Sequence, residues 1–189
     1  MFKRISIAAA ILAAATAPAF AHLDPAEHGS FMAGVSHPLF GVDHIIVMVA
    51  VGLWAAMIGG KALWVVPAAF IGTMAVGFLL AIGGIRLPFV EPVILASVVA
   101  LGLLVAMAVR LPVAASAAVV GVFALFHGHA HGGELGGAGA LQFGLGFLIA
   151  TAALHIAGIG LGVTLGRNQT VARILGGVAA LGGVALMFG

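Results

Sequence analysis

Histidine and aspartate recur at helical spacing in residues 37–44, whose sequence is HPLFGVDH. If this stretch is a helix, His37 and His44 are two turns apart and lie on one face of it. A proline and a glycine inside the stretch loosen the helix and free carbonyl oxygens near these side chains. His44 would lie on the order of 18 Å below the outer end of its helix. A carboxylate and an imidazole at that depth in a membrane, Asp43 and His44, predict a functional site. The alternative is a structural pair of Asp43 with a histidine that joins two helices.

A second histidine-rich stretch lies at residues 126–132, with the sequence FHGHAHG. His127 and His131 are four residues apart and share a helix face, whereas His129 points about 160° away from each of them. Glu134 follows shortly after. A solvated loop of histidines is the alternative interpretation of such a tract. Together with residues 37–44, the tract predicts a set of metal ligands contributed by two helices.

Imidazoles with a few carboxylates and no thiolate suit borderline divalent cations such as Ni2+, Co2+, Zn2+ and Cu2+. The chain has eight histidines and no cysteine, which excludes disulfides, thiolate metal sites and Fe–S clusters. A permeating ion needs sites that replace its hydration without holding it permanently. Histidines spaced along several helices meet that need better than one closed cage. The sequence therefore predicts a transported divalent metal ion and no permanently bound cofactor.

The elements that position these groups must lie in membrane lipid. Of the 189 residues, 63% are hydrophobic and 6% are charged, whereas a soluble domain carries about 25% charged residues. Seven Lys and Arg with five Asp and Glu cannot cover a water-soluble surface of this size. The composition excludes a soluble enzyme and a disordered tail. The lack of a Lys and Arg cluster excludes a nucleic-acid partner.

The first 21 residues have the three parts of a secretory signal peptide. Lys3 and Arg4 precede an apolar run over residues 5–17, and an A-x-A cleavage site ends at Ala21. An uncleaved anchor is the alternative, but the apolar run is short for a span of ~20 residues. Cleavage would leave residues 22–189 as the mature domain, with its N-terminus outside the cytoplasm. In a bacterium that N-terminus would be periplasmic.

Breaks at glycine, proline and charged residues divide the mature chain into six apolar stretches. Each can cross a hydrocarbon core of about 30 Å as a helix, and backbone in lipid must satisfy its own hydrogen bonds. The predicted fold is an all-α membrane protein, a bundle of six transmembrane helices after a cleaved signal peptide. The predicted spans are 32–58, 62–82, 90–109, 112–130, 140–164 and 170–188.

Loop charges give an independent prediction of orientation. If the mature N-terminus is outside, the only Lys or Arg in the outer loops is Arg86, whereas the cytoplasmic loops contain Lys61, Arg110, Arg167 and Arg173. This bias obeys the positive-inside rule and predicts a multi-pass protein of the inner membrane. An inside-negative potential would favour entry of a divalent ion by about 4.6 kcal/mol per 100 mV.

Further histidines join the predicted metal ligands. His155 lies about 22 Å into the fifth span, toward its cytoplasmic half. Its side chain either forms a hydrogen bond between two helices or passes the metal ion on toward the cytoplasm. After cleavage, His22 would offer its α-amino group and its imidazole to a divalent cation. Nearby Glu27 and His28 fit a mobile polar tail equally well.

The two histidine stretches resemble the motifs of the HupE/UreJ family, HPxxGxDH at residues 37–44 and FHGxAHG at residues 126–132. The signal peptide, the six spans and the chain length are also similar, so the resemblance covers the whole chain. That family comprises nickel, sometimes cobalt, permeases of the bacterial inner membrane, associated with hydrogenase or urease maturation. The resemblance implies import of Ni2+ or Co2+, with hydrogenase or urease maturation factors as downstream partners. It implies metal-handling roles for His37, Asp43, His44, His127 and His131.

The prediction is a transporter and not an enzyme, with two alternatives left open. One is an intramembrane metal-dependent hydrolase with Asp43 as its general base, although the H-E-x-x-H motif does not occur. The other is a non-transporting membrane partner that hands metal to a maturation factor, for which the short cytoplasmic loops offer little docking surface. The sequence does not distinguish nickel from cobalt as the substrate, or uniport from proton-coupled transport. It also leaves open whether the chain forms a homo-oligomer.

Overall fold

The computed structural model describes residues 30–135, 139–165 and 168–188. Every regular element in these ranges is an α-helix, as the sequence predicted. The helices are α2 (Phe31–Phe40), α3 (Val42–Ile58), α4 (Ala62–Ile82), α5 (Val90–Ala106), α6 (Val113–Leu135), α7 (Ala140–Leu165) and α8 (Gln169–Phe188). The predicted signal peptide, residues 1–21, and the predicted ligand His22 lie outside the described residues.

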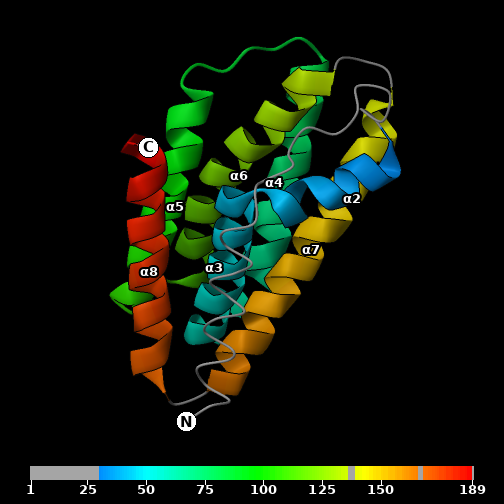
Figure 1. Cartoon of the computed structure of the whole chain (residues 1–189). Coiled ribbons are helices and arrows are strands. Elements are labelled where there is room, and N and C mark those ends of the chain that lie inside the picture. Colours follow the sequence, from blue (N-terminus) through cyan, green and yellow to red (C-terminus); the bar gives the residue numbers. More distant parts are fainter. Residues whose placement is uncertain (1–29, 136–138, 166–167, 189) are drawn as a thin grey trace, which may run out of the picture.

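The helices form a bundle in which most elements run side by side (Figure 1). The closest partners are α4 with α6, α5 with α8, and α3 with α7. The short α2 crosses the bundle and packs on α7. This arrangement brings α2, α3, α6 and α7 together around the end of α3 where that helix begins.

The first predicted span, residues 32–58, is not one straight helix. It divides at Gly41 into α2 and α3, which are bent by 81° relative to each other. Pro38 lies in the last turn of α2, where it lacks the N–H that would continue the helical ladder. Gly41 has an extended backbone and donates its own N–H to the carbonyl of His37 at 3.1 Å. The prediction that His37 and His44 share one face of a continuous helix is therefore wrong.

Four described helices are long and apolar enough to cross a membrane by themselves, namely α4, α6, α7 and α8. The pair α2 and α3 meets the same test only as one broken span. Helix α5 is apolar but has 17 residues, which gives it a length of about 26 Å. The six predicted spans thus coincide with helices, and four of them are clear membrane spans by length and composition.

Glycines allow the helix pairs to approach closely. A Cβ atom at Gly128 of α6 would collide with the carbonyl of Met74 in α4, and one at Gly77 of α4 would collide with the carbonyl of Leu125 in α6. Gly158 has the same role where α7 packs on α3. Such contacts between small residues are typical of helices packed in lipid. The close approach at Gly128 lies within the second histidine stretch.

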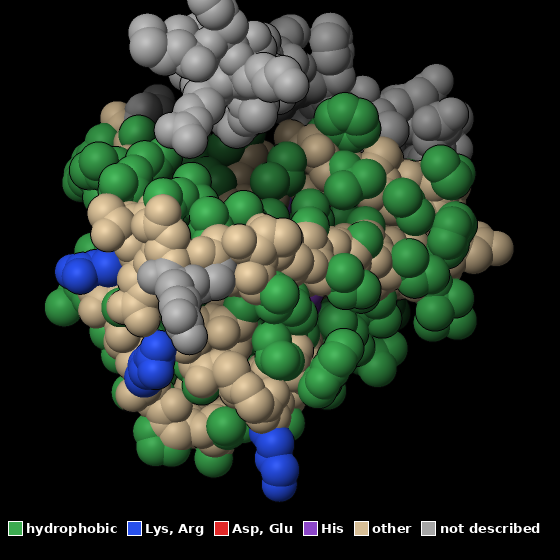
Figure 2. All heavy atoms as spheres, turned by 90° about the horizontal axis from the view of Figure 1, so that it is seen from below, with side chains coloured by type: hydrophobic (Ala, Val, Ile, Leu, Met, Phe, Trp, Pro, Cys, Tyr) green, Lys and Arg blue, Asp and Glu red, His purple; other side chains and the backbone are tan. Residues whose placement is uncertain are grey.

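The two ends of the bundle differ in charge. Lys61, Arg110 and Arg173 are exposed at the end where α3 and α7 finish, whereas Arg86 lies at the opposite end. Figure 2 shows this basic end, where blue side chains stand among hydrophobic ones and no acidic side chain of the described residues is visible. Arg173 Nε also donates to the carbonyl of Ala106 at 2.8 Å, which satisfies the C-terminus of α5. Three of the four basic residues predicted for the cytoplasmic loops thus lie at one end of the bundle, and the fourth, Arg167, lies outside the described residues.

Candidate metal site

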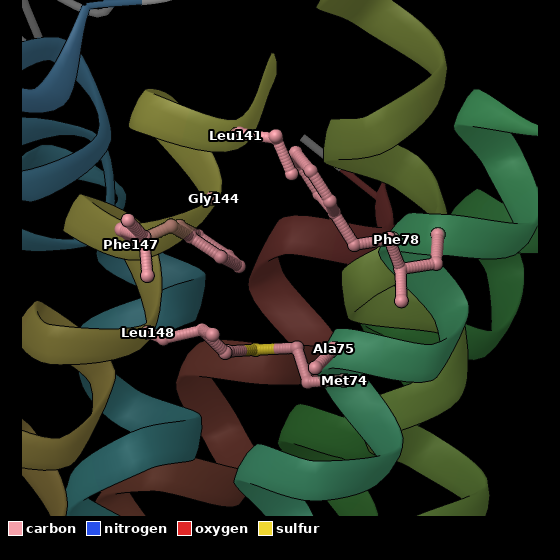
Figure 3. A pocket seen from close by; sticks show the side chains of 9 residues that line it. Met74, Ala75, Phe78, Leu141, Gly144, Phe147 and Leu148 are labelled. Atoms are coloured by element: carbon pink, nitrogen blue, oxygen red, sulfur yellow. The ribbon is translucent and has the colours of Figure 1, made fainter.

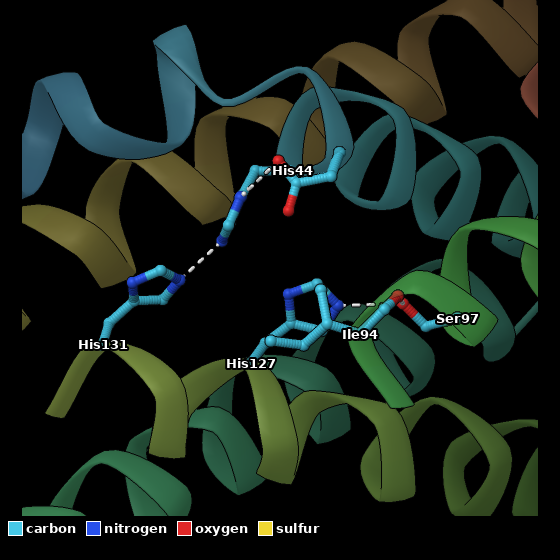
Figure 4. A network of polar contacts seen from close by, with 6 residues as sticks. His44, Ile94, Ser97, His127 and His131 are labelled. Atoms are coloured by element: carbon cyan, nitrogen blue, oxygen red, sulfur yellow. Dashed lines mark hydrogen bonds and ion pairs between the residues drawn. The ribbon is translucent and has the colours of Figure 1, made fainter. Parts of the chain in front are cut away.

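Three histidine rings from three helices meet where α2 and α3 join. His44 Nε2 at the start of α3 lies 2.7 Å from His131 Nε2 of α6 (Figure 4). The ring centroid of His37 in α2 is 4.4 Å from that of His131 and 5.5 Å from that of His44. One ring nitrogen from each of the three lies within 4.8 Å of the others. We call His37, His44 and His131 the three-histidine cluster.

The cluster has the donors and the spacing of a site for a borderline divalent cation. His44 and His131 are 4% and 5% exposed; α3, which carries His44, packs mainly on α7, and α6, which carries His131, packs mainly on α4. Two imidazole nitrogens bound at right angles to one ion would be about 3 Å apart, given metal–nitrogen distances of about 2.1 Å. The observed 2.7 Å separation requires only a small opening to reach that geometry. One nitrogen of this pair must carry the proton of the hydrogen bond, so the other presents its lone pair.

Asp43 lies behind His44 and is not one of the three clustered ligands. Its Oδ1 atom is 3.1 Å from Nδ1 of His44, on the ring edge away from His131. The two atoms are at ion-pair distance but not in hydrogen-bond geometry, so the carboxylate acts through its charge, which favours a proton on Nδ1 and a lone pair on Nε2. In metal sites where a carboxylate accepts the N–H of a ligating histidine, it orients the ring and raises its basicity. The sequence placed Asp43 among the metal residues, and the structure gives it a positioning geometry.

We predict that Asp43→Asn weakens binding of Ni2+ by about 10- to 100-fold, the usual cost of losing such a partner of a metal-bound histidine. Asparagine keeps the size of the side chain but removes its charge. The measurement is a Ni2+ titration of purified protein in detergent, with thermal unfolding as a control for the fold. An unchanged affinity in a stably folded variant would show that the carboxylate does not act through His44.

The other histidines of α6 have different surroundings. His127 is fully buried and its ring centroid is 5.3 Å from that of His44, so it borders the three-histidine cluster. Its Nε2 lies 2.9 Å from Oγ of Ser97 in α5. His129 Nε2 donates to the carbonyl of Ile85 at 2.7 Å, in the connection between α4 and α5. His129 therefore points away from the cluster, as its spacing predicted.

The structure does not bring His155 into the cluster. His155 lies eight residues beyond Phe147 on α7, about 12 Å farther toward the basic end. It is 1% exposed, and neither ring nitrogen has a hydrogen-bond partner among the described residues. The ring of Phe70 in α4 contacts both His155, at a centroid distance of 5.1 Å, and His127, at 5.9 Å. The helix–helix hydrogen bond that the sequence offered as an alternative for His155 is thus not found within the described ranges.

Aromatic rings of α7 close one side of the three-histidine cluster. The ring centroid of Phe147 is 4.8 Å from that of His131, and that of Phe143 is 5.8 Å from that of His37. These rings cover this side of the cluster with apolar surface, and the faces of aromatic rings attract cations. Sequence reasoning missed them, although their spacing of four residues places them on one face of the fifth span. It also missed Ser97, one of the few hydroxyl groups in the apolar stretches.

An apolar cavity of about 140 Å³ lies between α4 and α7 on the other side of this aromatic wall. Figure 3 shows Phe147, Phe78, Met74 and Leu148 around it. All nine residues that line it are apolar or glycine, so it offers no metal ligand. The cavity is therefore not a metal site, and the three-histidine cluster is the candidate in this region.

Comparisons with known proteins identify the family of the chain. The family described as HupE / UreJ protein matches residues 9–186 of the chain. The chain is 50% identical over 182 residues to Protein HupE of Rhizobium leguminosarum bv. viciae, in an alignment that covers 94% of this chain and 95% of that protein. No solved structure matches the chain. The extent of the family match and the identity to this relative show that the chain belongs to the HupE/UreJ family.

Proposed function

We propose that this protein is a secondary permease that imports Ni2+, or Co2+, across the bacterial inner membrane. Membership of the HupE/UreJ family supports a nickel or cobalt transport-related role in general. The observation that carries the specific proposal is the three-histidine cluster, buried at a break between two helices of an apolar bundle. Burying such polar groups in lipid is costly and is typical of ion pathways.

The break between α2 and α3 suits a cation site. Discontinuous helices in transporters place helix ends beside the transported ion, and carbonyl-rich C-terminal ends attract cations. The C-terminal end of α2 adjoins the cluster, and it carries His37 in its last turn. The N-terminal end of α3 is electropositive, but Asp43 in its first turn offsets that charge. Together, the C-terminal end of α2 and the charge of Asp43 make the electrostatic potential at the cluster favourable for a divalent cation.

We place the ion's route from the three-histidine cluster along His127 and past Phe70 to His155. Buried and unpaired in the described part of the chain, His155 supplies an inner station before the basic end. His22 would act as an outer station in the mature protein. The membrane potential, about 4.6 kcal/mol per 100 mV for a divalent ion, is sufficient to drive entry.

The proposed topology has six crossings with the mature N-terminus in the periplasm. The broken pair α2 and α3 forms the first crossing and the short α5 the third. Residues 1–21 are removed as a signal peptide, and residues 22–189 form the permease domain. The exposed basic residues Lys61, Arg110 and Arg173 would then lie in the cytoplasm. Hydrogenase or urease maturation factors would receive the imported metal there.

An intramembrane metal-dependent hydrolase fits the geometry less well. Its general base must reach a water molecule beside the metal. Asp43, the carboxylate near the cluster, lies 3.1 Å from His44 Nδ1 instead and acts on that ring. A permease needs no such base, so the geometry favours transport.

The proposal is tested by uptake of radioactive Ni2+ into bacterial cells that lack their own nickel importers. Cells that express the wild-type chain are expected to accumulate Ni2+ saturably, and cells with an empty vector are not. Excess Co2+ should compete if the chain also carries cobalt, and Zn2+ serves as the second competitor. Accumulation equal to that of the empty-vector cells, with the chain detected in the membrane, would contradict the proposal.

A further inference from the structure

Ser97 of α5 is a buried hydroxyl whose only hydrogen has a defined acceptor. Ser97 Oγ lies 2.6 Å from the carbonyl oxygen of Ile94, one turn earlier in the same helix. The same Oγ lies 2.9 Å from Nε2 of His127 in α6. Ser97 and His127 are both fully buried. The two contacts form a chain from a backbone carbonyl to an imidazole.

The direction of these two hydrogen bonds follows from the number of hydrogens. A carbonyl oxygen can only accept, so the shorter contact uses the serine hydrogen to donate to Ile94. Ser97 Oγ must then accept from His127, which places the ring proton on Nε2. The second ring nitrogen, Nδ1, keeps its lone pair. Nδ1 is buried and has no hydrogen-bond partner among the residues that the structure describes.

The opposite tautomer of His127 is disfavoured for a physical reason. It would place the proton on Nδ1, where a buried N–H group would have no acceptor within the described ranges. A buried donor without an acceptor costs its full desolvation free energy. A lone pair with an apolar neighbour loses less, and it is also the form that a cation can use.

The free lone pair lies on the side of the three-histidine cluster. Figure 4 shows one ring nitrogen of His127 on the side of Ser97 and the other on the side of His44 and His131. The ring centroids of His127 and His44 are 5.3 Å apart. The Nδ1 atom of His127 thus has a lone pair available for a metal ion. It lies next to the cluster but is not one of the three ligand atoms.

We propose that Ser97 is a positioning residue, which fixes the tautomer of His127 so that Nδ1 accepts the metal ion as it leaves the three-histidine cluster. Metal-binding histidines commonly donate their other N–H to an oxygen that fixes the ring, and such partners strongly affect affinity and activity. Ser97 fills this role for His127 through a hydrogen bond, whereas Asp43 lies near His44 Nδ1 at ion-pair distance. The inference deepens the proposed transport function and rests on it.

The chain offers a matched control in Ser116 of α6. Ser116 is also fully buried, and its hydroxyl donates at 3.3 Å to the carbonyl of Pro112, the residue just before α6. It lies more than two helical turns before His127 on the same helix. Replacing either serine by alanine removes one buried hydroxyl, so a difference between the two variants reports on the histidine.

The first experiment compares Ni2+ uptake by wild type, Ser97→Ala, Ser97→Thr, Ser116→Ala, His127→Ala and the double variant Ser97→Ala/His127→Ala at equal membrane levels. Ser97→Ala is expected to raise KM or lower the maximal rate about 10- to 100-fold. Ser116→Ala should match wild type, and Ser97→Thr should restore much of the activity because it keeps a hydroxyl. In the His127→Ala background, Ser97→Ala should have no further effect. Wild-type uptake by Ser97→Ala, or an equal added loss without His127, would overturn the inference while leaving the transport proposal intact.

A second measurement does not depend on transport. Nitrogen NMR of purified protein with 15N-labelled histidine distinguishes a protonated ring nitrogen from one with a lone pair, and His127→Ala assigns the signal. We expect His127 to carry its proton on Nε2 in wild type and to populate both tautomers in Ser97→Ala. A single unchanged tautomer in both proteins, or a proton on Nδ1 in wild type, would refute the role of Ser97 even if the chain does not transport nickel.

Discussion

Replacing His131 by alanine is expected to reduce Ni2+ uptake by more than about 100-fold, because loss of a ligand should exceed the 10- to 100-fold cost of losing a ligand's partner. His131 joins the other two rings of the cluster, with its Nε2 2.7 Å from that of His44 and its ring 4.4 Å from that of His37. Its removal leaves two ligands where three converge. The measurement is the initial rate of radioactive Ni2+ uptake at equal amounts of protein in the membrane.

His129→Ala is the control for this variant. His129 lies two residues earlier on α6, but it donates to the carbonyl of Ile85 and faces away from the cluster. Its replacement removes an imidazole from the same helix without touching the three ligands, so uptake should remain close to wild type. Equal uptake by His131→Ala and wild type would show that the cluster is not on the ion's route. Equal losses in both alanine variants would show that any histidine of this helix end matters, whatever its position.

The second large effect is expected for Gly128→Ala, a change of one methyl group. A Cβ atom at Gly128 would collide with the carbonyl of Met74 and press on the backbone at Phe78, so α4 and α6 must separate. Overpacking of this kind costs about 1–3 kcal/mol and occasionally more. Because Gly128 follows His127 directly, the shift also moves that ring. We expect a lower midpoint of thermal unfolding in detergent and reduced Ni2+ uptake.

Gly72→Ala is the matched control on the partner helix α4. Gly72 is exposed, and a Cβ atom there would meet no atom within 4 Å. Alanine at an open position in a helix should leave stability unchanged or raise it by about 0.5–1 kcal/mol. If Gly128→Ala unfolds at the same temperature as Gly72→Ala, the close approach of α4 and α6 does not hold the bundle together.

The positions of the helices could be predicted from the sequence. The composition places the chain in lipid, where long apolar stretches must be helices. Six apolar stretches follow from length and from breaks at glycine, proline and charge, and each of them contains helix in the structure. The bend between α2 and α3 could not be predicted in the same way. Pro38 and Gly41 indicate a weakened helix, but the angle of 81° depends on how α2 packs against α7.

The proximity of His37 and His44 was expected for a reason that the structure does not support. Their seven-residue spacing would align them on a straight helix, whereas the bend at Gly41 brings their rings to 5.5 Å. The meeting of His44 with His131 is a contact between helices, which helical periodicity in one segment cannot specify. The positioning geometry of Asp43 and the contact of Ser97 with His127 likewise depend on packing between neighbouring groups and helices.

The surroundings of His155 were also beyond prediction from the sequence. Spacing gives its depth in the fifth span, but not that both of its nitrogens lack a partner among the described residues. The ring of Phe70, which contacts His155 and His127, comes from another helix and carries no polar signal in the sequence. An apolar residue beside a histidine site becomes visible only when the packing is known.

The most direct test of the proposed mechanism is Ni2+ influx into liposomes that contain only the purified protein. With an inside-negative potential imposed, we predict saturable influx by wild type and by His129→Ala, and loss of that influx in His131→Ala. Influx should fall when the potential is removed, because the divalent charge supplies the driving force. Influx by wild type no greater than that of protein-free liposomes would contradict the claim that this histidine cluster carries nickel across the membrane.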